Sequence, residues 1–159
     1  MTRAGIGYDS HRFAAPGPMV LGGVTIEGDV RLAGHSDGDA VVHAVIDAML
    51  GAAGLEDIGT LFPDTDPANA NRNSMEMLTL AVQRLHQAGW RVQQVDITVI
   101  AERPRLQPHR AAMRARLAGA LGVQVSDVNV KGKSNEGMGW IGRAEGLACM
   151  AVATVVPVG

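Results

Sequence analysis

The segment of residues 35–53 constrains the fold most, because a polar run, His-Ser-Asp-Gly-Asp, leads there directly into a long apolar stretch. Apolar residues recur at helical spacing as far as Ala53, and Gly54 follows as a suitable helix stop. Ser36 or Asp37 is expected to cap the first turn by accepting hydrogen bonds from its free N–H groups. The segment therefore predicts a buried helix around which the rest of the chain is organised.

This predicted helix carries polar groups on one face. Asp39, His43 and Asp47 follow one another at intervals of four residues, and residues at this spacing share a helix face. A buried helix gains nothing in packing from a row of carboxylate, imidazole and carboxylate. The spacing therefore indicates a site whose remaining groups come from other segments.

Hydrophobic periodicity and turn residues predict the other elements. They are, in order, a strand (5–13), a hairpin turning at two glycines (19–26), a loop (55–72), a helix capped by Asn73 with Glu76 and ending at Gly89, a strand (90–101), a helix with Pro108 in its first turn (to 121), a strand (125–131), a glycine-rich segment (132–143) and a last strand (147–156).

This order predicts an α+β fold, a two-layer sandwich with a mixed sheet and helices on one face. A chain of 159 residues is long enough for one domain with a core of its own, which we expect to span residues 1–159. The other sheet face needs a cover, and the small aliphatic side chains of residues 147–156 predict that another subunit provides it.

Charge and cysteine content exclude several classes of partner. The net charge is −2, and no basic run interleaved with aromatic residues predicts a nucleic-acid surface. The longest apolar run, residues 147–156, is too short to cross a bilayer as a helix, and residues 1–5 show no apolar signal region. The single cysteine, Cys149, excludes an internal disulfide and fits a reducing compartment, so we expect a cytoplasmic protein.

Three side chains form a candidate metal site. Asp9 and His11 point to the same side of the first strand, and the nearby Gly5 and Gly7 leave room on that side. With His43 they make three N/O ligands, a set that leaves tetrahedral Zn²⁺ one open position, as in catalytic zinc sites. Asp47, one turn beyond His43, is expected to orient a ligand histidine. The alternative, that both histidines are merely hydrogen-bonded core residues, is equally compatible with the spacing.

Two other segments are candidate phosphate or sugar sites. His35 precedes a helix N-terminus, which attracts anions. Residues 132–143 combine glycines with Lys133, Ser134 and Arg143, which suit phosphate, and with Glu136, which suits Mg²⁺ bridging phosphates. A flexible connecting loop is the plainer interpretation of these residues. Three aspartates of the 55–72 loop suit sugar hydroxyls or a cation, but taken alone they are better explained as part of a solvated loop, and His35 alone as a surface histidine.

Four motifs together resemble one family. They are Gly7-Tyr8-Asp9-Ser10-His11, His35-Ser36-Asp37-Gly38-Asp39 with His43, Asp57-Ile58-Gly59 with Phe62-Pro63-Asp64-Thr65-Asp66-Pro67, and Gly142-Arg143-Ala144-Glu145-Gly146. The set is similar to that of the 2-C-methyl-D-erythritol 2,4-cyclodiphosphate synthases of the non-mevalonate isoprenoid pathway. The similarity covers nearly the whole chain.

The resemblance implies a homotrimer of two-layer α+β subunits with active sites between neighbouring subunits. It implies a phosphorus–oxygen lyase that converts 4-diphosphocytidyl-2-C-methyl-D-erythritol 2-phosphate into 2-C-methyl-D-erythritol 2,4-cyclodiphosphate. In this reaction the 2-phosphate attacks the β-phosphorus and CMP leaves, which requires positioning and charge neutralisation rather than a protein nucleophile. The trimer cavity of the family can hold an isoprenoid diphosphate, with the arginine that matches Arg143 at its mouth.

The resemblance also assigns roles to residues. Zinc falls on Asp9, His11 and His43, and Mg²⁺ or Mn²⁺ on Glu136 together with the substrate diphosphate. The catalytic groups that stabilise the transition state fall on His35 and Ser134. The implied substrate-binding residues are Asp9, His11, His35, Ser36, Asp57, Ile58, Gly59, Phe62, Pro63, Asp64, Thr65, Asp66, Ala101, Glu102, Arg103, Pro104, Arg105, Leu106, Gln107, Lys133, Ser134, Asn135, Glu136, Trp140 and Arg143.

One segment departs from the family pattern. Lys133-Ser134-Asn135-Glu136 stands where a threonine-rich run ending in glutamate is common, although the middle hydroxyl and the carboxylate are kept.

Two alternatives to the cyclase remain. One is a zinc-dependent phosphohydrolase of a nucleotide-linked substrate, which needs a general base and releases a linear product. The other is a non-catalytic binding module, which does not explain why the zinc ligands, His35, Ser134 and Glu136 occur together.

Overall fold

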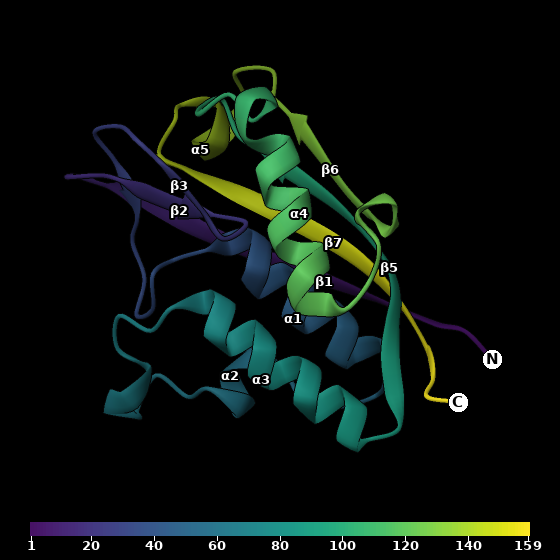
Figure 1. The fold of residues 1–159 in the computed structure, drawn as a ribbon. Helices are drawn as coiled ribbons and strands as arrows, with labels where there is room; N and C mark the ends of the chain where they lie inside the picture. The colour runs from purple at the N-terminus through teal and green to yellow at the C-terminus, as the bar shows by residue number, and fades with distance from the viewer.

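A computed structural model describes the whole chain, Met1–Gly159. Its main sheet has five strands in the order β4-β1-β7-β5-β6, and a separate hairpin pairs β2 with β3. The β5 and β6 strands are parallel and the other neighbours antiparallel, so the sheet is mixed as expected. The helices α1, α3 and α4 lie on one face of this sheet (Figure 1). None of the helices is both long and apolar enough to span a membrane.

The elements follow one another as the periodicity predicts, with the addition of several short helical turns and of the short strand β4. They are β1 (Arg3–Ala14), β2 (Met19–Leu21), β3 (Val24–Ile26), β4 (Arg31–Leu32), α1 (Ala40–Ala52), α2 (Ile58–Leu61), η1 (Pro67–Asn69), α3 (Ser74–Gln87), β5 (Trp90–Ile100), η2 (Gln107–His109), α4 (Arg110–Leu121), η3 (Val125–Asp127), β6 (Val128–Lys133), α5 (Gly139–Gly142) and β7 (Gly146–Pro157).

The α1 helix begins later than the sequence predicts. Its N-cap is Asp39, so the expectation that Ser36 or Asp37 caps it is wrong. The Asp39 carboxylate is completely buried and accepts the N–H groups of Val42 (3.1 Å) and of Gly22 and Gly23 (2.8 Å each). The cap lies at Asp39 because the same carboxylate also satisfies the two glycine N–H groups in the turn of the β2–β3 hairpin.

Replacing Asp39 with alanine is expected to destabilise the protein by about 3 kcal/mol, since it removes a helix cap and leaves buried N–H groups without an acceptor. Urea unfolding measures this loss. Alanine at the exposed Asp29, whose only ion pair is a 3.4 Å surface contact with Arg103, is the control and should shift stability by less than about 1 kcal/mol. Equal stability of the two variants would contradict this role of the Asp39 cap.

Other boundaries also differ from the prediction, and hydrogen bonds explain why. The 55–72 loop contains α2 and η1, because the side chains of Asp57 and Asp66 accept the N–H groups of Thr60 (2.8 Å) and Ala68 (2.9 Å). The strand expected from residue 125 begins only at Val128, after a helical turn. The α4 helix likewise follows a short 3₁₀ turn. Asn73 caps α3 as expected, but through the N–H of Met75 (2.8 Å).

The core lies between the sheet and its helices. The buried side chains are mainly aliphatic, and they include an apolar stripe on each of α3 and α4. Cys149 on β7 is buried among them, and burial raises the pKa of its thiol well above the usual range. The opposite face of β1 and β7 leaves four large apolar side chains exposed, namely Ile6, Tyr8, Met150 and Val152.

Candidate metal centre and substrate pockets

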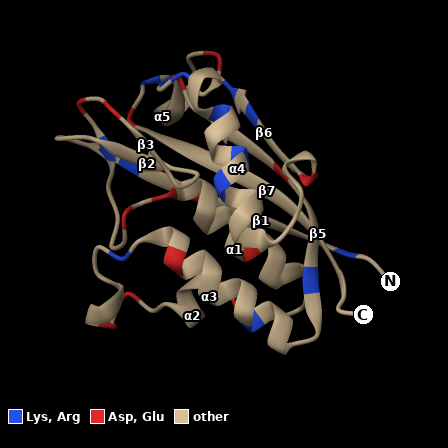
Figure 2. Cartoon of the chain, viewed as in Figure 1, with Lys and Arg blue, Asp and Glu red and all other residues tan.

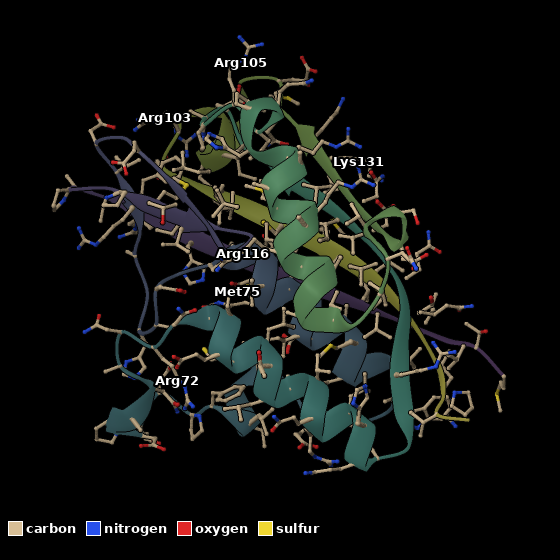
Figure 3. The ribbon with its side chains drawn as sticks, viewed as in Figure 1. Arg72, Met75, Arg103, Arg105, Arg116 and Lys131 are labelled. Atoms are coloured by element: carbon tan, nitrogen blue, oxygen red, sulfur yellow. The ribbon has the colours of Figure 1, made fainter.

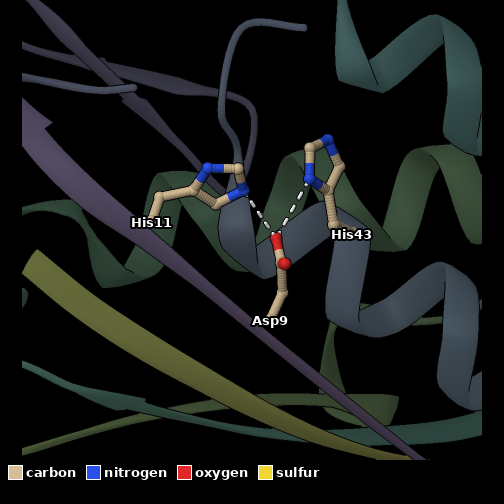
Figure 4. A group of neighbouring side chains, drawn as sticks. All are labelled: Asp9, His11 and His43. Atoms are coloured by element: carbon tan, nitrogen blue, oxygen red, sulfur yellow. Dashed lines mark hydrogen bonds and ion pairs between the residues drawn. The ribbon is translucent and has the colours of Figure 1, made fainter. Parts of the chain in front are cut away.

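The structure brings Asp9, His11 and His43 into one cluster (Figure 4). Strand alternation places the first two on the same side of β1, and α1 packs over that side with His43 near its start. Asp9 Oδ2 lies 2.8 Å from His11 Nε2 and 3.0 Å from His43 Nδ1. The strand β1 and the helix α1, which the sequence alone could not bring together, thus meet at this cluster. Each of its three side chains offers one ligand atom, in a group that could hold a metal ion.

The outer nitrogen of each histidine contacts a second partner. His11 Nδ1 lies 2.7 Å from the carbonyl oxygen of Ala33. Because a carbonyl only accepts, this nitrogen carries the proton, and a neutral His11 presents the lone pair of Nε2 to the cluster. His43 Nε2 lies 2.8 Å from Ser74 Oγ and 3.2 Å from Ser36 Oγ. These contacts fit a metal site, where ligand histidines are held through their other nitrogen.

Electrostatics favour positive charge in this cluster. Burial acts to raise the pKa of Asp9, but hydrogen bonds with His11 and His43 outweigh it and leave this pKa below its usual value. Burial acts to lower the pKa of His11, but the hydrogen bond with Asp9 outweighs it and leaves this pKa raised. The charged form of Asp9 and a positive charge on His11 thus favour each other, which is the charge complementarity that a bound cation also provides.

The predicted polar row on α1 does not act as one site. Asp39 is the helix cap, and Asp47 accepts the N–H of Ile58 (2.8 Å) instead of a histidine hydrogen bond. The expectation that Asp47 orients a ligand histidine is therefore wrong, because its carboxylate accepts a hydrogen bond from the N–H of Ile58 at the start of α2. Burial raises the pKa of Asp47, with the Ile58 hydrogen bond acting against that shift. Only His43 of the three reaches the cluster.

A pocket of about 280 Å³ opens on the cluster. It is lined by Asp9, His11, Gly34, His35, Ser36, His43, Ile58, Gly59, Phe62, Asp64, Asn69 and Met77. Most of the site residues predicted from the first three motifs therefore meet here, whereas Asp57, Pro63, Thr65 and Asp66 do not line it. Sequence reasoning missed Gly34, Asn69 and Met77. Asn69 had a signal, since it is a polar side chain in a candidate loop, and it is buried with its amide donating to the Pro63 carbonyl (2.9 Å).

A second pocket of about 540 Å³ lies beside α4 and β6. It is lined by Ala101, Glu102, Pro104, Arg105, Leu106, Gln107, Arg110, Val130, Lys131, Gly132, Lys133 and Ser134. Several Lys and Arg positions lie along α4 and β6 (Figure 2), and Figure 3 shows the side chains of Arg105 and Lys131 in the half of the molecule that contains α4 and β6. Gly132 belongs to the candidate phosphate segment, but sequence reasoning missed Arg110, Val130 and Lys131, although basic residues flanking that segment were visible in the sequence.

Five further predicted binding residues line neither pocket. Arg103 turns away to lie over the Phe13 ring, 5.2 Å from its centroid. The N–H of Asn135 donates to Glu102 (2.7 Å), Glu136 is exposed, Trp140 lines a separate small cavity with His11, and Arg143 pairs with Glu145 (2.6 Å). No residue lines both main pockets, so a single chain presents two separate pockets.

Comparisons with known proteins agree with the motifs. The YgbB family model matches residues 2–156. The 2-C-methyl-D-erythritol 2,4-cyclodiphosphate synthase of Gemmatimonas aurantiaca is 63% identical over 159 residues, which is 100% of this chain and 96% of the relative. Among solved structures, the Plasmodium falciparum IspF CDP complex has a TM-score of 0.86 and 34% identity, with coverage of 99% of this chain and 97% of that one.

This chain also matches one part of a longer protein. The bifunctional IspDF of Campylobacter jejuni has a TM-score of 0.95 and 39% identity; the match covers 99% of this chain but only 43% of that one. The α+β fold with a mixed five-stranded sheet is thus shared with solved structures of the family. The resemblance inferred from the motifs is confirmed: this chain belongs to the YgbB family, the 2-C-methyl-D-erythritol 2,4-cyclodiphosphate synthases.

Proposed function

We propose that this chain is an enzyme that forms 2-C-methyl-D-erythritol 2,4-cyclodiphosphate from 4-diphosphocytidyl-2-C-methyl-D-erythritol 2-phosphate, with release of CMP. The observation that carries the proposal is identity to a named synthase over the whole chain. The reaction is a phosphorus–oxygen lyase reaction of isoprenoid precursor biosynthesis. The name of the Plasmodium falciparum CDP complex supports a cytidine diphosphate ligand for the larger pocket.

Asp9, His11 and His43 would hold Zn²⁺, and Glu136 together with the substrate diphosphate would hold Mg²⁺ or Mn²⁺. These ions supply Lewis-acid charge neutralisation when bound. The chain itself binds and orients the two ends of the substrate. Its α4–β6 pocket offers lysine and arginine side chains to the nucleotide end, and the smaller pocket offers His35 and Ser36 to the phosphate that attacks.

A homotrimer would join the two pockets as half-sites. A single chain keeps its pockets apart and leaves Ile6 64%, Tyr8 54% and Val152 45% exposed on the bare sheet face, which supports burial against other copies. An isoprenoid diphosphate in the central cavity, near Arg143, belongs to the same proposal. The buried lone thiol of Cys149 supports a cytoplasmic location.

Phosphorus NMR of the protein with the cytidyl substrate and Mg²⁺ tests the proposed reaction. We expect cyclic diphosphate and stoichiometric CMP, with turnover abolished by a chelator and restored by Zn²⁺. CMP with a linear product would favour the phosphohydrolase instead. No turnover by the zinc-loaded protein would favour a binding module.

Ser134→Ala is expected to lower turnover roughly 10²-fold while changing zinc affinity little, because this hydroxyl lines the nucleotide pocket and lies away from the zinc cluster. Steady-state kinetics and zinc titration measure the two effects. Alanine at Ser126, exposed in η3, is the matched control and should retain parent turnover. Unchanged turnover of Ser134→Ala would assign the hydroxyl role to another residue.

A further inference from the structure

We infer that Ser74 and Asp37 are positioning residues that fix the ring nitrogen through which His43 binds metal. Ser74 is the first residue of α3, completely buried, and its Oγ lies 2.8 Å from His43 Nε2. Asp37 comes from the loop before α1 and contacts Ser74 in turn. The inference rests on the proposed metal site, and it assigns roles to two residues outside the ligand set.

The α3 helix does not need the Ser74 hydroxyl. Its cap is Asn73, whose side chain accepts the N–H of Met75 (2.8 Å). The Ser74 hydroxyl instead contacts only Asp37 and His43. The buried Ser74 hydroxyl therefore does not cap α3, and its two partners are the metal-cluster residue His43 and Asp37. Stabilising the start of α3 does not explain these contacts.

The hydrogen-bond directions in this chain of contacts are determined by chemistry. The Asp37 carboxylate accepts the Ser74 N–H (2.9 Å to Oδ2) and, with its other oxygen, the Ser74 hydroxyl. A carboxylate has no hydrogen to donate, so the only hydroxyl hydrogen of Ser74 goes to Asp37. Ser74 Oγ can then only accept from His43, and the ring proton of His43 must lie on Nε2.

In the neutral ring this proton position leaves the His43 lone pair on Nδ1, so that the Nδ1 proton that donates to Asp9 in the charged ring is the one that a metal ion replaces. That nitrogen faces Asp9 Oδ2 at 3.0 Å, on the inner side of the cluster. His11 is held in the same manner, with its outer Nδ1 donating to the Ala33 carbonyl and its Nε2 facing inward. Ser74 and Asp37 thus do for His43 what a backbone carbonyl does for His11, and both imidazoles are oriented before a metal binds.

Zinc titration against a competing chelator tests this inference without any cyclase assay. Ser74→Ala is expected to bind Zn²⁺ about 10- to 100-fold more weakly than the parent, and Asp37→Asn should show a loss in the same range. The Asp37 carboxylate accepts the Ser74 N–H and hydroxyl with two different oxygens. An amide replaces one of these oxygens by a donor NH₂ group, so it no longer fixes the direction of that hydroxyl. Thr79→Ala removes another hydroxyl from α3, one that donates to the Met75 carbonyl (3.1 Å), and should bind zinc as the parent does.

Nitrogen NMR of the zinc-loaded parent provides a second measurement that needs no variant. We expect a His43 Nε2–H resonance protected from exchange and zinc ligation through Nδ1. Ligation through Nε2, or equal zinc affinities of Ser74→Ala and the parent, would overturn the inference while leaving the metal site intact. A parent that binds no zinc would overturn the metal site and this inference together, whereas zinc binding without cyclisation would contradict only the proposed reaction.

Discussion

Replacement of His43 by alanine is expected to abolish both stoichiometric zinc binding and turnover, the latter by roughly 10³-fold or more. His43 is the one ligand contributed by α1, and the two remaining side chains, both from β1, cannot hold a catalytic zinc ion alone. The imidazole borders a pocket, so its loss need not collapse the core, and the variant should stay folded. Metal analysis after equilibration with zinc, and phosphorus NMR of the reaction, measure the two losses.

His86→Ala is the matched control for this variant. His86 lies exposed near the end of α3 and is absent from both pockets, so its removal should alter neither zinc content nor turnover. A His43→Ala protein that retained zinc and turnover would remove His43 from the ligand set. Loss of secondary structure by circular dichroism would instead show that the imidazole mainly supports the fold.

The sequence predicts the parts of this site that depend on local periodicity. Strand alternation places Asp9 and His11 on one side of β1, and helical spacing places His43 on α1. Asp9 and His43 are 34 residues apart in the chain and meet only in the tertiary structure, so periodicity alone could not choose between a metal site and two unrelated core histidines. The family resemblance made that choice, because its motifs contain both segments together.

The predictions that fail do so where one side chain has several possible partners. Asp37, Asp39 and Asp47 all stand near a helix start or face, and the sequence gives no means of knowing which N–H groups each will meet. In the structure, Asp39 accepts N–H groups of the β2–β3 turn, Asp37 accepts one at the start of α3, and Asp47 accepts one at the start of α2. Ser74 escaped notice for the same reason, since its partner His43 lies 31 residues away.

Gly7 determines how closely α1 approaches the sheet, and Gly7→Ala is expected to destabilise the protein by at least about 3 kcal/mol. A Cβ at this position would lie 1.9 Å from the carbonyl oxygen of Ala44, a backbone atom of a buried helix that cannot turn aside. Gly5, two residues earlier on the same side of β1, meets α1 similarly, since a Cβ there would lie 2.2 Å from the Ala48 carbonyl oxygen. The space that the sequence leaves beside Asp9 is thus filled by helix backbone, and widening it would also move His43 away from β1.

Urea unfolding and zinc titration together test this packing, and Gly51→Ala is the matched control. Gly51 lies on the same helix, and a Cβ added there would meet nothing within 4 Å, so alanine should be neutral or stabilising by up to about 1 kcal/mol. For Gly7→Ala we expect a lower urea midpoint and weaker zinc binding, because a shift of α1 away from β1 also moves the zinc ligand His43, which belongs to that helix. Parent-like values for both would mean that α1 can retreat from β1 without disturbing the metal cluster, and the close backbone contact would then have no part in positioning His43.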